Sequence, residues 1–304
     1  MHLMWSYLAA ALLAILGDAA RANERCPPAG YTRDQLFELK ARQFAIEDDR
    51  VRNALAIALL PCLADPDPQL RDGVAYEALV AWLRNERIKQ PTVDAVRQAL
   101  LPQLAVDYPD PTGVARPFAA LALAEVARMD RIKLFMTSAQ RDELLRAATS
   151  FLRTVSDYRG FDSQVGWRHG VAHGADLLMQ LALHPSATKR DLDAILDALG
   201  AQIAPRGEHS YIYGEGNRLA RPVFYIAQRG THAEAEWREW LTQHVAPRPF
   251  KDWSETFQSQ AGLSKRHNTA AFLGALFVYV QTSGNPKAQA ALLPPLLDAM
   301  KQVP

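Results

Sequence analysis

The chain has 304 residues, of which 49% are hydrophobic and 22% are charged. These proportions exclude a disordered chain, a collagen-like repeat and a small disulfide-stapled domain. The 34 basic and 33 acidic side chains give a net charge of +1 with no long basic run, so no nucleic acid is expected as a partner.

The first 22 residues have the features of an export signal. An apolar run over residues 3–17 precedes Ala20-Arg21-Ala22, a small-x-small pattern typical of signal-peptide cleavage sites. The alternative is a buried first helix. The run is shorter than the roughly 20 apolar residues of a transmembrane helix, and no other stretch is long and apolar enough. We therefore expect a cleaved signal peptide over 1–22, a periplasmic or secreted mature chain, and no transmembrane anchor after cleavage.

Export also gives a role to the two cysteines, Cys26 and Cys62. An oxidising compartment would allow them to pair. The bridge would close a loop of about 36 residues and contribute roughly 3 to 4 kcal/mol to stability. Because Cys62 lies in an apolar segment, the alternative is a buried free thiol. No C-x-x-C motif is present, so we expect a structural disulfide.

Beyond residue 32 the apolar residues recur at helical spacing, and strand-like alternation is scarce. Helix-capping patterns stand at Thr32, Asp67, Thr137 and Thr188. The pattern predicts about six helical hairpins, which begin near residues 32, 68, 115, 166, 215 and 265. A spacing of roughly 40 to 50 residues is typical of HEAT and armadillo arrays. We predict an all-α, HEAT- or armadillo-like solenoid in one domain over residues 23–304; a closed α/α toroid is the alternative.

The segment 166–178 holds His169, His173 and Asp176. If the segment is helical, these three side chains lie along one stripe. Two histidines four residues apart, completed by a carboxylate, can bind a divalent metal ion such as zinc. Alternatively, the histidines hydrogen-bond to neighbouring groups and fix the packing of the helix.

Polar and aromatic residues also stand at the starts of three successive first helices. Equivalent positions of stacked repeats become neighbours, so we expect these residues to line one edge. The set is Asp157, Tyr158, Arg159, Trp167, Glu215, Arg218, His267 and Asn268. They would form a pocket for an anion or a metal-bound substrate. The alternative is that the charged members form ion pairs that set the stacking angle of the repeats.

The same stretches resemble a bacterial family catalogued as domain of unknown function 2785. The residues that carry the resemblance are Asp157-Tyr158-Arg159-Gly160, Gly166-Trp167, His169, Ala172 to Leu178, Gly214-Glu215, Arg218-Leu219-Ala220, Asn268, Phe272-Leu273 and Leu276-Phe277. The resemblance covers roughly residues 70 to 300. This chain departs from it at Gly216-Asn217, where an acidic pair is expected, and in its export signal. The resemblance implies an all-helical fold and no settled activity.

Three functions follow from these patterns. The leading interpretation is an exported protein that binds a small-molecule or protein partner along the polar edge. The alternative is a metal-dependent hydrolase or lyase, with the metal at His169, His173 and Asp176, Glu215 as general base and Arg218 as anion clamp. The third is a purely structural array. No G-x-S-x-G elbow, phosphate loop or dinucleotide-binding glycine motif is present.

Overall fold

The computed structural model describes residues 26–304, so the predicted signal peptide over 1–22 lies outside the described residues. Nearly all regular structure in this range is helical. The elements are α2 (Arg33–Ala41), α3 (Asp49–Ala58), η1 (Leu60–Ala64), α4 (Pro68–Leu70), η2 (Arg71–Tyr76), α5 (Glu77–Arg84), α6 (Gln90–Leu100), η3 (Leu101–Leu104), α7 (Ala115–Ile132), α8 (Ser138–Thr154), β1 (Phe161–Asp162), β2 (Gly166–Trp167), α9 (Gly170–Ala182), α10 (Lys189–Ala201), α11 (Glu215–Gln228), α12 (Glu234–His244), η4 (Glu255–Gln258), α13 (Gln260–Thr282) and α14 (Pro286–Gln302). The all-α prediction is confirmed. None of these helices is long and apolar enough to cross a membrane.

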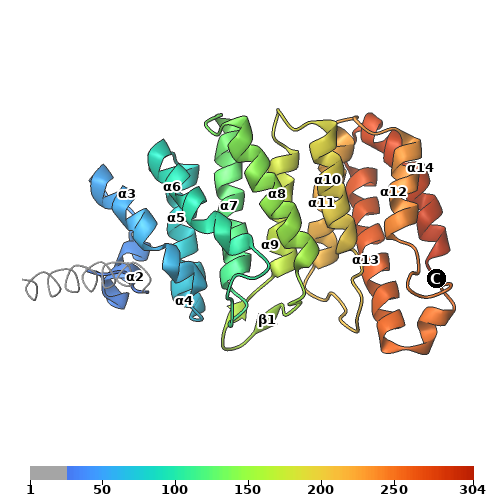
Figure 1. Cartoon of the computed structure of the whole chain (residues 1–304), viewed down its shortest axis with the longest axis horizontal. Coiled ribbons are helices and arrows are strands. Elements are labelled where there is room, and N and C mark those ends of the chain that lie inside the picture. The colour runs from blue at the N-terminus through green and yellow to red at the C-terminus, as the bar shows by residue number, and fades with distance from the viewer. Residues whose placement is uncertain (1–25) are drawn as a thin grey trace, which may run out of the picture.

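The helices follow one another in chain order along the long axis of the molecule (Figure 1). The first helices of successive pairs begin at residues 33, 68, 115, 170, 215 and 260, close to the predicted hairpin starts. The α2–α3 pair and α14 lie at opposite ends (Figure 1). The described chain is therefore an open row of hairpins and not a closed toroid, whereas its assignment to the HEAT or armadillo type stays a prediction.

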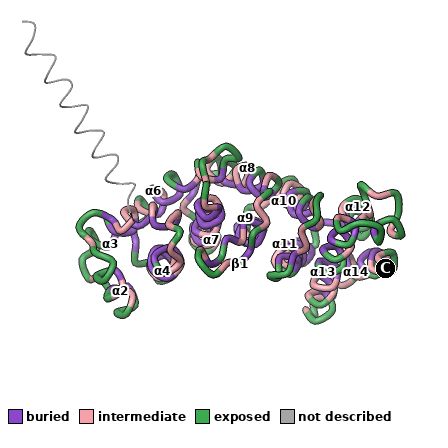
Figure 2. The backbone as a smooth tube through the Cα atoms, turned by 90° about the horizontal axis from the view of Figure 1, so that it is seen from below, coloured by how far each residue is buried: buried purple, intermediate pink, exposed green. Residues whose placement is uncertain are grey.

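The row has two layers and bends gently. Figure 2 shows α4, α7, α9, α11 and α13 on the inner side of the arc, and α6, α8, α10 and α12 on the outer side. The core lies between the layers and runs through every hairpin. Helix α7 buries a series of alanines, which lets its neighbours approach closely. Helix α7 accordingly packs closely against α9.

Side-chain caps determine where several of these helices begin. Thr32, Thr137 and Thr188 each accept a hydrogen bond from the backbone N–H three residues later, in complete capping boxes. Asp67 accepts one from the N–H of Gln69. The caps predicted from the sequence are confirmed. Each satisfies backbone N–H groups in the first turn of a helix, which have no acceptor within the helix.

A disulfide joins the chain before α2 to the η1 turn. Cys26 and Cys62 are bonded, with their Cα atoms 4.9 Å apart. Cys62 is also fully buried, so it belongs to the core as well as to the bridge. The predicted pairing is confirmed.

Candidate functional site

A short hairpin projects from the edge at which α9 begins. Strands β1 and β2 pair in antiparallel fashion, with Phe161 opposite Trp167 and Asp162 opposite Gly166. The Asp162 carboxylate accepts hydrogen bonds from the backbone N–H groups of residues 164 and 165, at 2.9 and 2.7 Å. Gly166 has a φ of +75°, in the region that favours glycine. The hairpin thus places two aromatic side chains at the surface.

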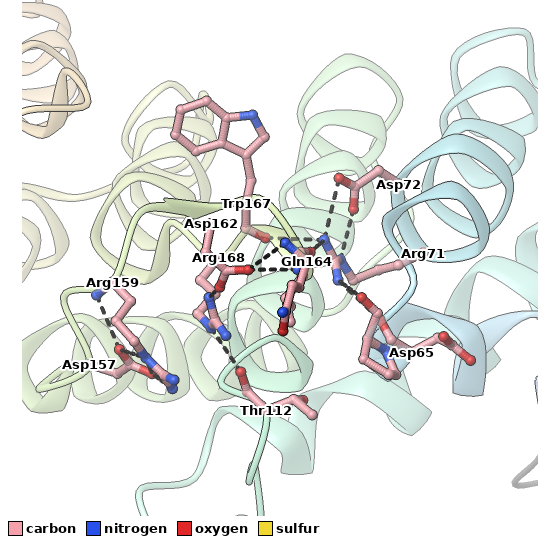
Figure 3. Close-up of polar contacts among 12 residues, drawn as sticks. Asp65, Arg71, Asp72, Thr112, Asp157, Arg159, Asp162, Gln164, Trp167 and Arg168 are labelled. Carbon is pink, nitrogen blue, oxygen red and sulfur yellow. Dashed lines mark hydrogen bonds and ion pairs between the residues drawn. The ribbon is translucent and has the colours of Figure 1, made fainter.

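Arg71, the first residue of the π-helical η2, fastens this hairpin to the second pair of helices, which contains η2, α5 and α6 (Figure 3). Its guanidinium is fully buried and donates to the carbonyl oxygens of Val165, at 2.8 Å, and Trp167, at 3.2 Å. It also donates to the carbonyl of Asp65 and pairs with the carboxylate of Asp72. One side chain therefore holds together backbone segments 94 and more residues apart. Arg71 lies in a π-helical turn, and such turns are frequently found at functional sites.

Arg168 is a second anchor from the other side (Figure 3). Its Nε donates to the carbonyl of Thr112 at 2.9 Å, its guanidinium pairs with Asp162, and its backbone N–H donates to Gly160. The hydrogen bond from Arg168 lowers the pKa of Asp162 to about 2. The base of the hairpin is therefore held on both sides.

Three exposed aromatic side chains form a patch above these anchors. Phe161, Trp167 and Tyr213, which we call the aromatic patch, are 49%, 38% and 36% exposed. The ring of Trp167 lies 5.1 Å from that of Phe161 and 5.4 Å from that of Tyr213, centroid to centroid. Its other neighbour is His169, stacked at 4.2 Å and nearly parallel. The patch is thus packed from within and open to solvent outside.

His169 does not lie on the helix, contrary to the predicted stripe. It is the N-cap of α9 and has left-handed backbone angles, φ 56° and ψ 39°. The strand pairing and the Arg168 contacts keep the chain extended up to this residue, so the helix begins at Gly170. His173 stands in the first turn, where its Nδ1–H donates to the carbonyl of Pro117 at 3.2 Å.

The predicted metal ligands do not converge. Asp176 is held by Arg218, with Nε and Oδ1 3.0 Å apart, and the His169 ring lies flat on Trp167. The centroids of the His169 and His173 rings are 5.8 Å apart. Within residues 26–304 no group of three His, Cys, Asp or Glu side chains is placed to hold a metal ion. The arrangement therefore does not fit a zinc-type site of His169, His173 and Asp176.

Glu215 and Arg218, the predicted catalytic pair, both have partners within the protein. Glu215, the first residue of α11, is buried and accepts a hydrogen bond from the Tyr213 N–H at 3.0 Å. Its other oxygen lies 3.9 Å from Nδ1 of His169, beyond hydrogen-bond range. This Nδ1 is buried and has no hydrogen-bond partner among the described residues. The Arg218–Asp176 pair joins α11 to α9 and remains partly exposed. The proposed roles of Glu215 and Arg218 in catalysis stay predictions.

Both histidines are held neutral. Burial, with the positive charge of Arg218 as a second cause, lowers the pKa of His169 to about 4. The same two causes, in the same order, hold the pKa of His173 well below its ordinary value. A neutral imidazole stacks on an indole without the cost of burying a charge.

Stability should therefore fall as the pH is lowered. The folded-state pKa of His169 lies below its unfolded value of 6.5, so its contribution is complete above pH 6.5 and is lost as the pH falls to about 4. Between pH 7.5 and 5.0 this group alone should cost about 2 kcal/mol. His169→Asn, which tolerates left-handed angles, should reduce the loss by that amount in urea unfolding. Arg50→Met, at an exposed position away from the site, is the control; equal pH-dependent losses in both variants would contradict the prediction.

The remaining predicted edge residues lie nearby but differ in role. Asp157 and Arg159 pair with each other within the loop, Nε to Oδ1 at 2.8 Å, and not with the neighbouring repeat. Together with Tyr158, His169 and Glu215 they line a crevice beneath the patch that is too narrow to admit a water molecule. In this conformation of the protein the crevice is closed, so a ligand would contact the outer surface of the aromatic patch.

His267 and Asn268 support the loop before α11. Asn268 is fully buried, accepts a hydrogen bond from the Tyr211 N–H at 2.7 Å and donates to the carbonyl of His209 at 3.0 Å. Nε2 of His267 donates to the Tyr211 carbonyl at 3.0 Å. Tyr158 stacks on His209 in turn, with ring centroids 5.4 Å apart. These residues position the loop that presents Tyr213, and do not themselves line the patch.

Three residues that shape the site have no predicted role in the sequence: Arg71, Arg168 and Phe161. Phe161 adjoins the Asp157–Gly160 run, so an aromatic residue beside that motif was an available signal, as Tyr213 is beside the Gly214-Glu215 turn. The sequence around Arg71 contains no such signal, because most of its partners are backbone carbonyls, two of them distant in sequence.

The family comparison covers this region of the molecule. Residues 105–278, more than half of the chain, match the model of a family described as "Protein of unknown function (DUF2785)". The match contains the aromatic patch, both histidines and the Asp176–Arg218 pair, whereas Arg71 and the disulfide lie before it. No curated protein and no solved structure matches the chain. The chain belongs to the DUF2785 family of proteins of unknown function.

Proposed function

We propose that the protein is an exported binding protein whose aromatic patch holds a small molecule or a protein segment with a flat or apolar ring. The observation that carries the proposal is the aromatic patch itself: three large side chains at one edge, exposed outside and packed within. Trp and Tyr bury much area at a small cost in side-chain entropy, and they dominate recognition surfaces.

The support beneath the patch favours binding over simple packing. Trp167 is fixed by its strand pairing, by the Arg71 hydrogen bond to its carbonyl and by stacking on His169. A surface already held in one conformation pays little ordering entropy when a ligand arrives. Arg218 and Arg159, both partly exposed and each paired with a carboxylate, lie beside it and provide polar contacts at the rim.

Export is supported by two independent features. Residues 1–22 have the apolar run and cleavage pattern of a signal peptide. The Cys26–Cys62 disulfide fits an oxidising compartment such as a bacterial periplasm or the cell exterior. N-terminal sequencing of the protein from cell fractions should find a chain that begins at Asn23; an intact N-terminus in the cytoplasmic fraction would contradict export.

The binding proposal is tested with Trp167→Ala and a matched control. Purified protein is screened by thermal shift against a panel of oligosaccharides, aromatic carboxylic acids and aromatic peptides, and affinities of hits are measured by calorimetry. Loss of a central aromatic contact costs about 2 kcal/mol, so Trp167→Ala should weaken binding about 30-fold. Phe257→Ala removes another aromatic side chain, 53% exposed and outside the patch, and should leave affinity unchanged.

The structural alternative gives a different result. If the patch serves only to pack the hairpin, Trp167→Ala lowers the free energy of unfolding while every hit binds both variants equally. That outcome would overturn the proposal.

A further inference from the structure

A second polar feature lies on the outer layer, away from the aromatic patch. A groove of about 600 Å³ runs between α8 and α10 and reaches the turn that joins α9 to α10. Ser186 stands on that turn with its side chain exposed, and His184, two residues earlier, is buried beside it. Both residues line the groove, so a molecule in it would meet the serine hydroxyl.

Three side chains form a continuous chain of contacts here. Oγ of Ser186 lies 2.8 Å from Nδ1 of His184, and Nε2 of His184 lies 3.0 Å from Oδ2 of Asp130. Asp130 is fully buried at the end of α7. Although these two atoms are 3.0 Å apart, the histidine–aspartate contact does not meet hydrogen-bond geometry, so Nε2 of His184 has no hydrogen-bond partner among the described residues. Such contacts are commonly loose before substrate binds.

The surrounding hydrogen bonds fix the direction of each group. The backbone N–H of Ser186 donates to Nδ1 of His184 at 3.2 Å, so this nitrogen carries a lone pair and the ring proton faces Asp130 from Nε2. Asp130 is oriented by the N–H groups of Phe135 and Met136, both at 2.7 Å. Burial lowers the pKa of His184, and Asp130 opposes that effect without reversing it, so the ring is neutral at neutral pH.

Arg229 holds the turn, and arginines line the groove. Arg229 donates to the carbonyls of Ala182 and His184 at 3.1 Å and to that of Ala187 at 3.0 Å. The groove arginines are Arg141, Arg146 and Arg190, and Arg141 pairs with the buried Asp130 at 3.5 Å. Arg146 and Arg190 form no ion pair within residues 26–304, so they are available to a negatively charged group on a substrate.

We infer that Ser186, His184 and Asp130 form a nucleophile–base–carboxylate site that hydrolyses carboxylic esters bearing an anionic group. Oγ of Ser186 attacks the ester carbonyl while its proton passes to Nδ1 of His184. The tetrahedral intermediate expels the alkoxide, which takes that proton and leaves as the alcohol. Water then attacks the acyl-serine, gives its proton to Nδ1, and releases the acid as the serine recovers its proton. Asp130 is a positioning residue, which holds the ring and stabilises its positive form.

A similar hydroxyl–histidine–carboxylate arrangement occurs at the turn between α11 and α12. Thr231 lies 2.9 Å from Nδ1 of His232, whose Nε2 lies 2.8 Å from Asp193. There the carboxylate is half exposed and paired with Lys189, whereas Asp130 is fully buried and paired with Arg141. A histidine at a turn between helices can thus serve structure alone, and the test must separate the two roles.

The test uses a fluorophosphonate reagent and two chromogenic esters, p-nitrophenyl acetate and p-nitrophenyl hemisuccinate. The reagent should label Ser186, identified by peptide mass spectrometry, and the hemisuccinate should be hydrolysed faster than the acetate. Ser186→Ala should abolish labelling and lower hydrolysis at least 100-fold. Ser150→Ala replaces an exposed serine of α8 that does not line the groove, and it should change neither.

Further readouts keep the result unambiguous. Labelling of the wild-type chain should slow as acid protonates His184, with helix content unchanged by circular dichroism. If Ser186 is labelled no faster than Ser150 in the folded wild-type chain, the inference is overturned without any variant. Equal hydrolysis by wild type and Ser186→Ala overturns it as well.

Discussion

Replacing Arg71 with Met should lower the free energy of unfolding by about 3 to 5 kcal/mol, measured by urea denaturation. The substitution removes the donor from the part-buried carbonyls of Asp65, Val165 and Trp167. The Asp72 carboxylate also loses its buried partner, but about a third of this side chain is exposed, so water partly replaces the lost ion pair.

The Arg71→Met variant should also change one region selectively. Hydrogen exchange of the backbone N–H groups over residues 160–169 should quicken, because the hairpin loses its anchor, while exchange in α13 should not. Arg50→Met removes an arginine whose side chain is 94% exposed and should alter stability by less than about 0.5 kcal/mol. An Arg71 variant as stable as that control would contradict the account of Arg71 as the anchor of the hairpin.

Loss of the disulfide should cost about 3 to 4 kcal/mol, because the bridge closes a long loop and limits the unfolded chain. The cleanest comparison is oxidised against reduced wild-type protein in urea, since Cys62 stays in the core in both. The Cys26→Ala, Cys62→Ala variant should lose more, because it also empties buried volume at position 62.

The double variant is also the control for side effects of the reducing agent, which should leave its free energy of unfolding unchanged. A difference of less than about 1 kcal/mol between oxidised and reduced wild type would mean that contacts of α2 already restrain the N-terminal segment.

Local sequence signals accounted well for where the helices lie. The threonine caps at 32, 137 and 188 act over three residues, and apolar spacing acts over one or two turns, so both can be recognised without knowledge of the rest of the chain. The hairpin starts followed from these signals. An open row and a closed ring share the same local pattern, and only the assembled structure distinguishes them.

The candidate site was predictable in composition but not in geometry. Residues from the starts of α9 and α11 do meet at one edge, as repeat stacking implies. His169 left the expected stripe because two non-local anchors, Arg71 and Arg168, keep the preceding chain extended. Contacts between a side chain and a distant carbonyl have no pattern in sequence, so the expected stripe of His169, His173 and Asp176 followed from the assumption of a continuous helix.

The long reach of Arg71 has a consequence for the way in which the array comes apart. A row in which each helical pair contacts only its neighbours can fray from either end, one pair at a time. Arg71, in the second pair, bonds to the loop that opens the fourth and also lies 4.6 Å from the ring centre of Phe118 in the third. These three pairs must lose their structure together, so the centre of the chain should melt as one cooperative unit while α13 and α14 fray independently.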